Sequence, residues 1–276
     1  MAVQDKATSE RRGIDPGWDE QHGRRTAMAH AGFFLPYLRP GMRVLDCGCG
    51  PGSITLGLAQ IIGDGSVVGI DIDQRRIDEA NARATQQGIT NVTFQVADIY
   101  ALPFADGEFD LAFEHSVFQH LAQRDPAARE ILRVLKPGGI FGASDRIIHA
   151  SGFSLDTPED AKLLAEAFHM EHEYQLTRGS DLDFGLRLAE VLSRAGFEGV
   201  VPSVAQEVLL TAEQKQAFAR SAIKLICESG TGEYADSAKG PGTADGYVAA
   251  IERYAGSQTA WLFGTNGEAL GRKPKA

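Results

Sequence analysis

The 276-residue sequence predicts an α/β fold, in which a mostly parallel sheet carries helices on both faces. Apolar runs typical of strands alternate with helical patterns from residue 43 to about residue 147. A turn with glycine at every second position joins the first strand to the first helix, and most of the strands end in a polar residue. No internal repeat interrupts this order, so we expect residues 1–276 to form a single domain.

Each element of the alternating region has its own signal. The strands are short apolar runs, expected at residues 43–46, 66–71, 92–97, 109–113 and 140–145. Helices are expected between them at residues 52–62, 74–87 and 126–135, and Asp73 is the expected N-cap of the second helix. Lys136-Pro137-Gly138-Gly139 is a strong stop signal for the third helix.

Two segments depart from this alternation, at residues 151–180 and 211–257. In the first, Thr157 is an expected N-cap with Pro158 at the first helical position. A helix from Ser180 to Gly196 should follow. In the second, we expect helices at 212–228 and 247–254, joined by a loop rich in glycine, aspartate and serine.

The remaining strands and the amino-terminal segment complete the order. Residues 197–204 and 206–210 are typical of a sixth strand that a bulge could interrupt, and residues 259–265 of a seventh. Within residues 1–40, the stretch 18–38 has a helical pattern.

Composition excludes several classes of partner and compartment. The net charge of -10 argues against a nucleic acid and against an anionic membrane surface. No apolar run is long enough to span a membrane, and residues 1–13 lack the apolar core of a signal peptide. The three cysteines have neither a disulfide nor a zinc spacing, so we expect a cytoplasmic protein with no metal site.

The glycine turn predicts a site for a nucleoside-bearing cofactor. Glycine adopts positive φ without steric cost and lets the backbone approach a ligand. Asp71 ends the next strand, where a carboxylate can accept hydrogen bonds from both ribose hydroxyls. Ser53 replaces the third glycine of the dinucleotide motif, and Asp46 would repel a pyrophosphate but could help to hold an ammonium group. These residues favour a cofactor without phosphate.

Asp46-Cys-Gly48-Cys-Gly50-Pro-Gly52 matches the first motif, D/E-x-G-x-G-x-G, of the class I S-adenosylmethionine (SAM)-dependent methyltransferases. Leu-Lys-Pro-Gly-Gly at residues 135–139 is also frequent in that family. The chain thus resembles the family over residues 18–200 and 258–273, and looks most similar to its quinone-biosynthesis and natural-product members. The resemblance implies a seven-stranded, mostly parallel Rossmann-like sheet with an antiparallel last strand.

The resemblance also implies where the cofactor binds. The glycines would face its methionine part, Asp71 its ribose and Ile72 its adenine, while Asp98 and the Ile99 amide would contact the adenine ring edge. The implied cofactor-binding residues are Asp46, Gly48, Gly50, Gly52, Thr55, Asp71, Ile72, Ala97, Asp98, Ile99, Glu114 and His115. Two alternatives stay open: Asp71 could cap the following helix, and Asp98 could be a turn residue. In the family, the segment ahead of the first strand folds over the cofactor.

Methyl transfer needs alignment of an acceptor with the sulfonium methyl, and a base only when the acceptor starts protonated. Histidine is the base that suits neutral pH, and His115 and His120 follow the fourth strand on the expected substrate side. His169 and His172 in the first insertion favour a solvated helix face. Six aromatic side chains could line an apolar substrate cavity or belong to the core: Trp18, Phe33, Phe34, Phe118, Phe153 and Phe168.

The sequence therefore predicts a SAM-dependent methyltransferase that acts on the oxygen, carbon or nitrogen of a small, fairly apolar molecule. The two insertions would form a helical cap over the substrate. Three alternatives remain at this point: cyclisation or other chemistry in the same fold, a NAD(P)-dependent oxidoreductase, and a non-catalytic SAM sensor. A homodimer is also left open.

Overall fold

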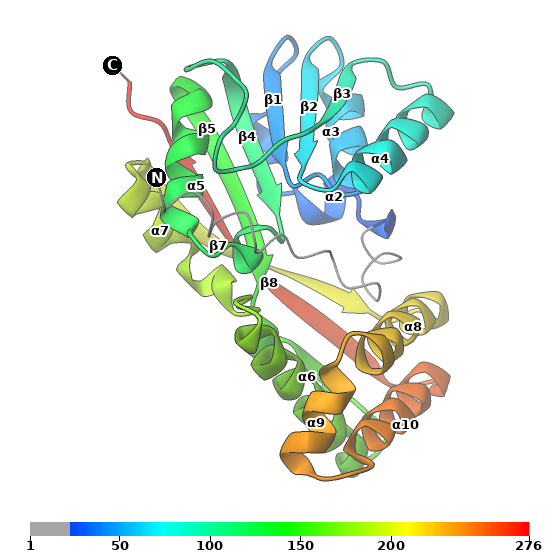
Figure 1. Cartoon of the computed structure of the whole chain (residues 1–276). Coiled ribbons are helices and arrows are strands. Elements are labelled where there is room, and N and C mark those ends of the chain that lie inside the picture. The colour runs from blue at the N-terminus through cyan, green and yellow to red at the C-terminus, as the bar shows by residue number, and fades with distance from the viewer. Residues whose placement is uncertain (1–22, 276) are drawn as a thin grey trace.

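The chain forms one sheet of eight strands with the order β3-β2-β1-β4-β5-β8-β6, and β7 pairs with β8 (Figure 1). The structure is a computed structural model, which describes residues 23–275. The strands are β1 (Arg43–Cys47), β2 (Ser66–Asp71), β3 (Val92–Val96), β4 (Phe109–His115), β5 (Leu135–Arg146), β6 (Gly152–Ser154), β7 (Glu198–Leu209) and β8 (Trp261–Arg272). The first five are parallel, and β8 runs antiparallel to its neighbours.

The prediction of a mostly parallel α/β sheet is therefore confirmed. The short strand β6 is an eighth strand that the sequence analysis does not predict. It pairs with β8 through Gly152 and Phe263, beyond the end of the β5 pairing.

The strand order places a topological switch point between β1 and β4. The chain runs outward from β1 through β2 to β3, and then returns to place β4 on the other side of β1. Cys47 at the end of β1 thus pairs with Ile70 on one side and with Glu114 on the other. Connections that leave neighbouring strands in opposite directions open a crevice at the carboxyl ends of the strands.

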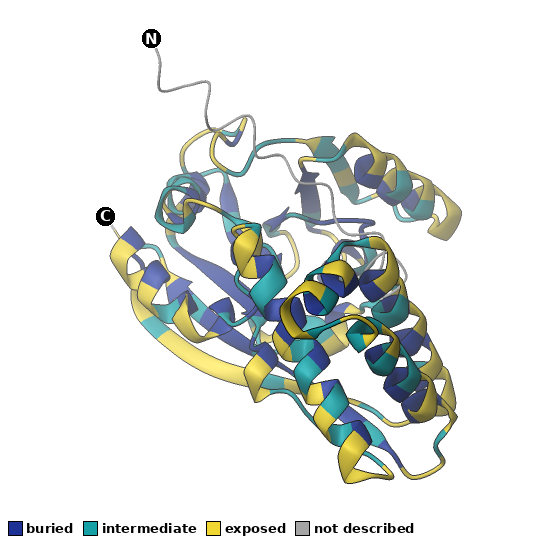
Figure 2. Cartoon of the chain, turned by 60° about the horizontal axis from the view of Figure 1, so that its bottom comes forward, coloured by how far each residue is buried: buried dark blue, intermediate teal, exposed yellow. Residues whose placement is uncertain are grey.

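Helices cover both faces of the sheet, as the sequence predicts. On one face α5 (Arg124–Val134) and α7 (Leu188–Ala195) bury a core with β4 and β5. On the other, α3 (Ser53–Ile62) packs with α2 (Ala27–His30). The helix α4 (Gln74–Gln87), capped by Asp73, lies beside β2 and β3. The sheet between these helices is largely buried (Figure 2).

Four further helices form a separate group at the far end of β7 and β8, called the helical lobe below (Figure 1). They are α6 (Pro158–Thr177), α8 (Ala212–Glu228), α9 (Thr231–Lys239) and α10 (Thr243–Gly256). The lobe has its own apolar core, in which Leu164, Phe218 and Tyr254 meet. Thr157 accepts a hydrogen bond from the Asp160 amide and caps α6, as expected.

The helix α9 corrects the predicted loop between residues 228 and 247. The glycine- and serine-rich composition of this segment favours a loop, but tertiary packing overrides that preference. Ala235 is fully buried, and the Tyr234 ring lies against Tyr174 of α6 with ring centroids 5.7 Å apart.

Other boundaries also differ from the sequence prediction. Strand β5 begins at Leu135 and includes Pro137, because Leu135 pairs with Phe109 of β4 ahead of a bulge. The helical pattern predicted for residues 18–38 does not form one continuous helix. After α2, the described part of this stretch holds only a 3₁₀ turn at Leu35–Tyr37. Residues 18–22 lie outside the described residues. Proline at position 36 cannot continue an α-helix.

Phe34→Ala is expected to lower the free energy of unfolding by about 3–5 kcal/mol. The Phe34 side chain is fully buried between α2 and the sheet, with its ring 5.2 Å from that of Phe113. Urea unfolding followed by circular dichroism measures the change. Met28→Ala in the same segment is the control, because Met28 is 71% exposed and should shift the free energy by less than about 0.5 kcal/mol. Equal effects of the two variants would contradict this packing.

Candidate functional site

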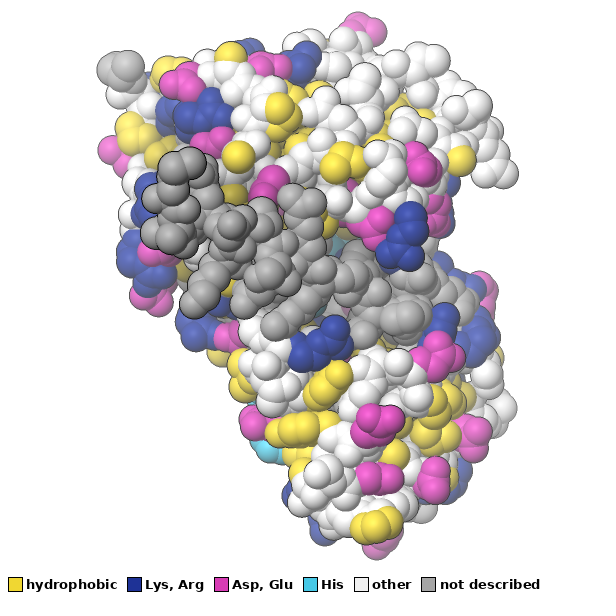
Figure 3. Space-filling view, viewed as in Figure 1, with side chains coloured by type: hydrophobic (Ala, Val, Ile, Leu, Met, Phe, Trp, Pro, Cys, Tyr) yellow, Lys and Arg dark blue, Asp and Glu magenta, His cyan; other side chains and the backbone are white. Residues whose placement is uncertain are grey.

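A cavity of about 1590 Å³ lies between the carboxyl ends of the parallel strands and the helical lobe. Residues after β1, β2, β3 and β4 form one wall, and the lobe contributes Gln175, Ala217 and Phe218. Pockets for a single small ligand usually measure roughly 300–1,000 Å³, so this cavity has room for two. On the face seen in Figure 3, side chains of both charges are interspersed over the described surface.

The glycine turn forms the floor of this cavity. Gly48, Gly50 and Gly52 have φ values of 72°, 52° and 77°, a region that other residues rarely adopt. A Cβ on Gly48 would lie 2.4 Å from Val117, and one on Gly52 would lie 2.9 Å from Phe94. At Gly50 a Cβ would meet no described atom within 4 Å, because that glycine faces the cavity.

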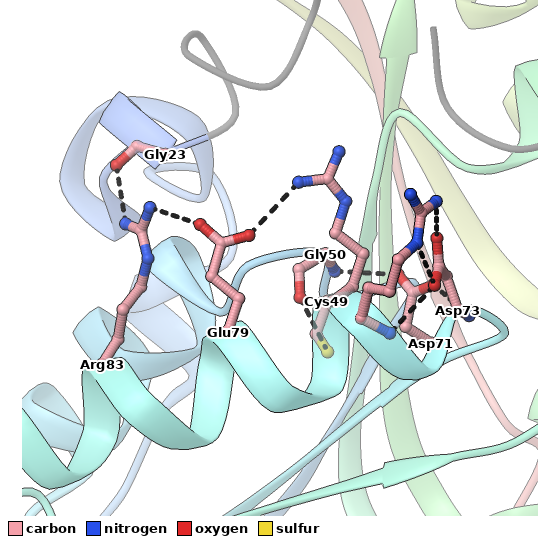
Figure 4. A network of polar contacts seen from close by, with 9 residues as sticks. Gly23, Cys49, Gly50, Asp71, Asp73, Glu79 and Arg83 are labelled. Carbon is pink, nitrogen blue, oxygen red and sulfur yellow. Dashed lines mark hydrogen bonds and ion pairs between the residues drawn. The ribbon is translucent and has the colours of Figure 1, made fainter. Parts of the chain in front are cut away.

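Asp71 ties the glycine turn to the start of α4. Its Oδ2 accepts a hydrogen bond from the Gly50 amide at 2.9 Å, and its Oδ1 accepts one from the Asp73 amide at 3.0 Å (Figure 4). Burial raises the pKa of Asp71, and the two amides oppose that shift. Asp73 is the N-cap of α4, since it accepts a hydrogen bond from the Arg75 amide. Asp71 itself lines the cavity.

Further along α4, a polar chain holds the amino-terminal segment in place. Glu79 accepts from Arg76 and from Arg83, and Arg83 also donates to the Gly23 carbonyl at 3.2 Å (Figure 4).

Asp46 lies at the end of β1, and Thr55 lies behind the cavity wall. The Thr55 hydroxyl donates to Asp46 Oδ2 at 2.5 Å, and both side chains are buried. Burial is the main cause that raises the pKa of Asp46 from 3.8 to about 7, and the nearby Asp71 adds to the shift. Asp46 lines the cavity, whereas Thr55 and Gly52 do not.

The end of β3 and the loop after β2 form an apolar rim with one carboxylate. Ala97, Asp98, Ile99 and Ile72 all line the cavity, and Ile72 is 41% exposed. Asp98 Oδ1 accepts a hydrogen bond from the Tyr100 amide at 3.0 Å, which is the turn role left open from the sequence. The apolar side chains of Ile72 and Ile99 make this rim suitable for a flat ring.

Glu114 supports the wall from behind. Its carboxyl is fully buried and accepts hydrogen bonds from the Val117 and Ser144 amides, each at 3.0 Å. Burial, followed by the nearby Asp145, raises the pKa of Glu114 well above its ordinary value. These contacts hold the turn in which Ser116 has a φ of 61°.

Both predicted histidines line the cavity. The His115 ring is 7% exposed and meets the His30 ring edge-on, with centroids 5.2 Å apart. His120 Nδ1 lies 3.1 Å from the Ser180 hydroxyl, and its Nε2 lies 2.9 Å from the Gln119 amide nitrogen. These two contacts fix the orientation of the His120 ring.

The aromatic residues considered from the sequence belong mostly to the cores. Phe34 and Phe118 are fully buried, and Phe33, Phe153 and Phe168 pack against core clusters. Trp18 lies outside the described residues. The aromatic side chains of the cavity wall include Tyr100 and Phe218 instead.

Sequence reasoning missed part of the wall. Arg25, His30, Arg146 and Glu207 come from three separate segments, and His30 Nε2 lies 3.6 Å from Glu207 Oε2. Burial lowers the pKa of Arg25 to about 10, and the nearby Arg146 contributes to that shift. The position of Arg146 at the end of the fifth strand was a usable signal, whereas Glu207 on β7 had none.

The interpretation of His172 as part of a solvated helix face is wrong. Its side chain is buried at 7% exposure, because α6 turns that face toward the loop that holds Asp183. His169 is exposed, as expected.

Comparisons with known proteins give the family and the fold of the chain. The family model described as "Methyltransferase domain" matches residues 38–176. An uncharacterized methyltransferase of Schizosaccharomyces pombe is 32% identical over 177 residues, which cover 62% of this chain and 64% of that relative. The chain thus spans slightly less than two thirds of the length of this curated relative.

Two solved structures are also similar. The [4+2]-cyclase SpnF is 26% identical with a TM-score of 0.53, over 94% of this chain and 80% of that one. Phosphoethanolamine N-methyltransferase 2 of Haemonchus contortus, in complex with S-adenosyl-L-methionine, is 23% identical with a TM-score of 0.54, over 87% of this chain and 50% of that one.

Within residues 23–275, none of the helices combines the length and the apolar character that crossing a bilayer requires.

Asp46→Asn is expected to flatten the dependence of stability on pH. The pKa of Asp46 is raised from 3.8 to about 7, so the folded state keeps a proton that the unfolded state releases. The stability that this proton contributes is present below pH 3.8 and is lost as the pH rises toward about 7. Asparagine keeps the acceptor for Thr55 and carries no charge.

Urea unfolding across this pH range measures the effect. Asp64→Asn is the matched control, because that side chain is exposed in a turn and should keep the wild-type profile. The free energy of unfolding of Asp46→Asn should still depend partly on pH, since burial also raises the pKa of Asp145 to about 7. The same slope in wild type and Asp46→Asn would refute the assignment.

Proposed function

The chain belongs to the methyltransferase domain family, and on that premise we propose that it transfers a methyl group from SAM to a small acceptor. The observation that carries the proposal is the glycine turn, which the Asp71 carboxylate holds at the switch point of the sheet. The turn lines a cavity that has room for two ligands. The transfer would be an in-line displacement, and the atom that accepts the methyl group would be oxygen, carbon or nitrogen.

The cofactor would occupy the half of the cavity that the parallel strands form. Each oxygen of Asp71 already accepts one backbone amide, and a carboxylate oxygen has a second lone pair for a ribose hydroxyl. Ile72 and Ile99 would enclose the adenine, and Asp98 would accept from its amino group. The open space at Gly50 would admit the methionine part beside Asp46.

The remaining predicted residues would act from the wall or from behind it. Gly48 and Gly52 allow the close approach of the turn to its neighbours, and Ala97 continues the adenine rim. Thr55 and Glu114 do not line the cavity, so their contribution would be indirect. Thr55 would act through Asp46, and Glu114 through the Val117 amide.

The acceptor would occupy the half that faces the helical lobe. Its wall mixes apolar side chains, such as Leu182 and Phe218, with polar ones that include Arg146, Glu171 and Gln175. We propose a largely apolar acceptor that carries at least one polar group. The insertions 151–180 and 211–257 supply α6 and α8 for this side, and residues 1–40 supply Arg24, which contacts Glu213 of α8, and His30.

Alignment would provide most of the rate enhancement, to which well-placed reactants contribute roughly 7–11 kcal/mol. His120 and His115 are the candidate bases for an acceptor that starts protonated. The contacts to Ser180 and Gln119 hold the His120 ring at the cavity wall, and one of them would be released when a ring nitrogen accepts the proton.

A second candidate function is cyclisation in the same pocket. The similarity to the cyclase SpnF, at 26% identity over 94% of this chain, favours it as the alternative. Its product would not gain the mass of a methylene group. The nicotinamide-dependent oxidoreductase and the SAM sensor gain no support from the comparisons.

We propose further that the protein works in the cytoplasm, as a monomer or a homodimer. Support for a reducing compartment comes from Cys47, Cys49 and Cys227, which are all free thiols. The net charge of -10 argues against nucleic acid as a partner.

Asp71→Asn is expected to weaken SAM binding by at least about tenfold. The variant loses charge-assisted hydrogen bonds to the ribose, which contribute roughly 1.5–3 kcal/mol. Isothermal titration calorimetry with SAM and with S-adenosylhomocysteine measures the affinities. Asp64→Asn should bind as the wild type does. A folded wild type that binds neither compound would remove the proposal, as would equal affinity in Asp71→Asn.

His120→Ala is expected to lower kcat by about 100-fold or more with a protonated acceptor, without raising KM for SAM. The acceptor is first found by incubating the protein with SAM and a compound library, and by detecting the mass gain of one methylene group. The pH profile of kcat should lose its acidic limb in the variant. Ser180→Ala, which removes only a partner of His120, should lose less activity. A kcat near that of wild type in His120→Ala would exclude this base, and His115→Ala then tests the other candidate.

A further inference from the structure

Three segments that are distant in the sequence bring metal-ligating side chains together outside the cavity. His149 lies in a 3₁₀ turn, Ile148–Ala150, that follows β5. His172 lies in the second half of α6, and Asp183 lies just before the 3₁₀ turn Phe184–Arg187. One ligand atom from each residue lies within 4.8 Å of the others. The three side chains do not line the cavity.

Asp183 is the centre of this group. Its Oδ2 contacts His149 Nδ1, and its Oδ1 accepts a hydrogen bond from the His149 amide at 3.0 Å. The same Oδ2 lies 3.9 Å from His172 Nε2. That separation is too long for a hydrogen bond, but it is near the roughly 3.3 Å between two ligands of one tetrahedral ion.

His172 contributes a second, buried imidazole, and the nitrogen that lies near Asp183 is its Nε2. Its side chain is buried at 7% exposure, and among residues 23–275 its Nδ1 has no hydrogen-bond partner. The ring nevertheless faces the group, with its centroid 4.9 Å from that of His149 and the two planes at 82°.

His169 extends the group by one more imidazole. It lies one turn before His172 on α6, and its Nδ1 lies 3.5 Å from His149 Nε2. If Nδ1 of His149 binds an ion, its other nitrogen faces His169, as an orienting partner of a metal-bound histidine does.

We propose that His149, His172 and Asp183 bind a divalent transition-metal ion of the zinc type. Two imidazoles and one carboxylate suit Zn²⁺, Co²⁺ or Ni²⁺, whereas Mg²⁺ and Ca²⁺ prefer oxygen ligands. The His149 side chain is 50% exposed, which leaves an open position for water. The ion would join α6 of the helical lobe to two segments that leave the sheet, so its main effect would be on stability.

Metal titration of the tag-free, chelator-treated protein tests the proposal. Co²⁺ should give a saturable visible absorption band with one ion per chain, and an equivalent of Zn²⁺ should displace it. Zn²⁺ should also raise the melting temperature. In His172→Gln and in Asp183→Asn the affinity should fall by at least about tenfold. Glu159→Gln, an exposed acid in the first turn of the same helix, should keep the wild-type affinity.

The variants are compared by circular dichroism, so that a folding defect is recognised. If His172→Gln does not fold, His149→Gln replaces it, because that side chain is half exposed. Absence of saturable Zn²⁺ binding in the wild type would overturn the proposal. Unchanged affinity in the folded ligand variants, or a preference for Mg²⁺ over Zn²⁺, would overturn it as well.

Discussion

The hydrogen bond from the Gly50 amide to the Asp71 carboxylate is the contact on which the geometry of the site depends. It joins the turn after β1 to the end of β2, and the second oxygen of Asp71 joins both to the start of α4 through Asp73. A buried carboxylate is costly unless its lone pairs are used, and two backbone amides reduce that cost. The same group can therefore shape the turn and remain available to a ligand at the cavity wall.

Other acidic side chains around this site are likewise engaged in internal hydrogen bonds. Glu114 binds the amides of Val117 and Ser144, and Asp46 accepts from Thr55. Burial raises the pKa of both carboxyls, to about 7 for Asp46 and well above the ordinary value for Glu114. Carboxyls near the ends of these strands thus brace the wall, and some of them also line the cavity.

The sequence predicts the parallel half of the molecule well, because its signals are local. The glycine turn, the strand that ends at Asp71 and the Asp73 cap each depend on neighbouring residues, and the structure has all three. The α9 helix and the buried face of α6 could not be predicted in this way. Ala235 is buried and His172 is enclosed only because distant segments pack against them. The extent of β8 likewise depends on pairing with β5 and β7.

The long pair formed by β7 and β8 has a mechanical consequence. The two strands are hydrogen-bonded from Glu198–Arg272 at one end to Leu209–Leu262 at the other, and they carry the chain from the sheet into the four-helix group (Figure 1). That group is consequently attached through a stiff two-stranded ribbon in addition to its other connections. Exchanging the group between homologues would therefore succeed only if the alignment of the two strands is kept, since a one-residue slip reverses which side chains face inward.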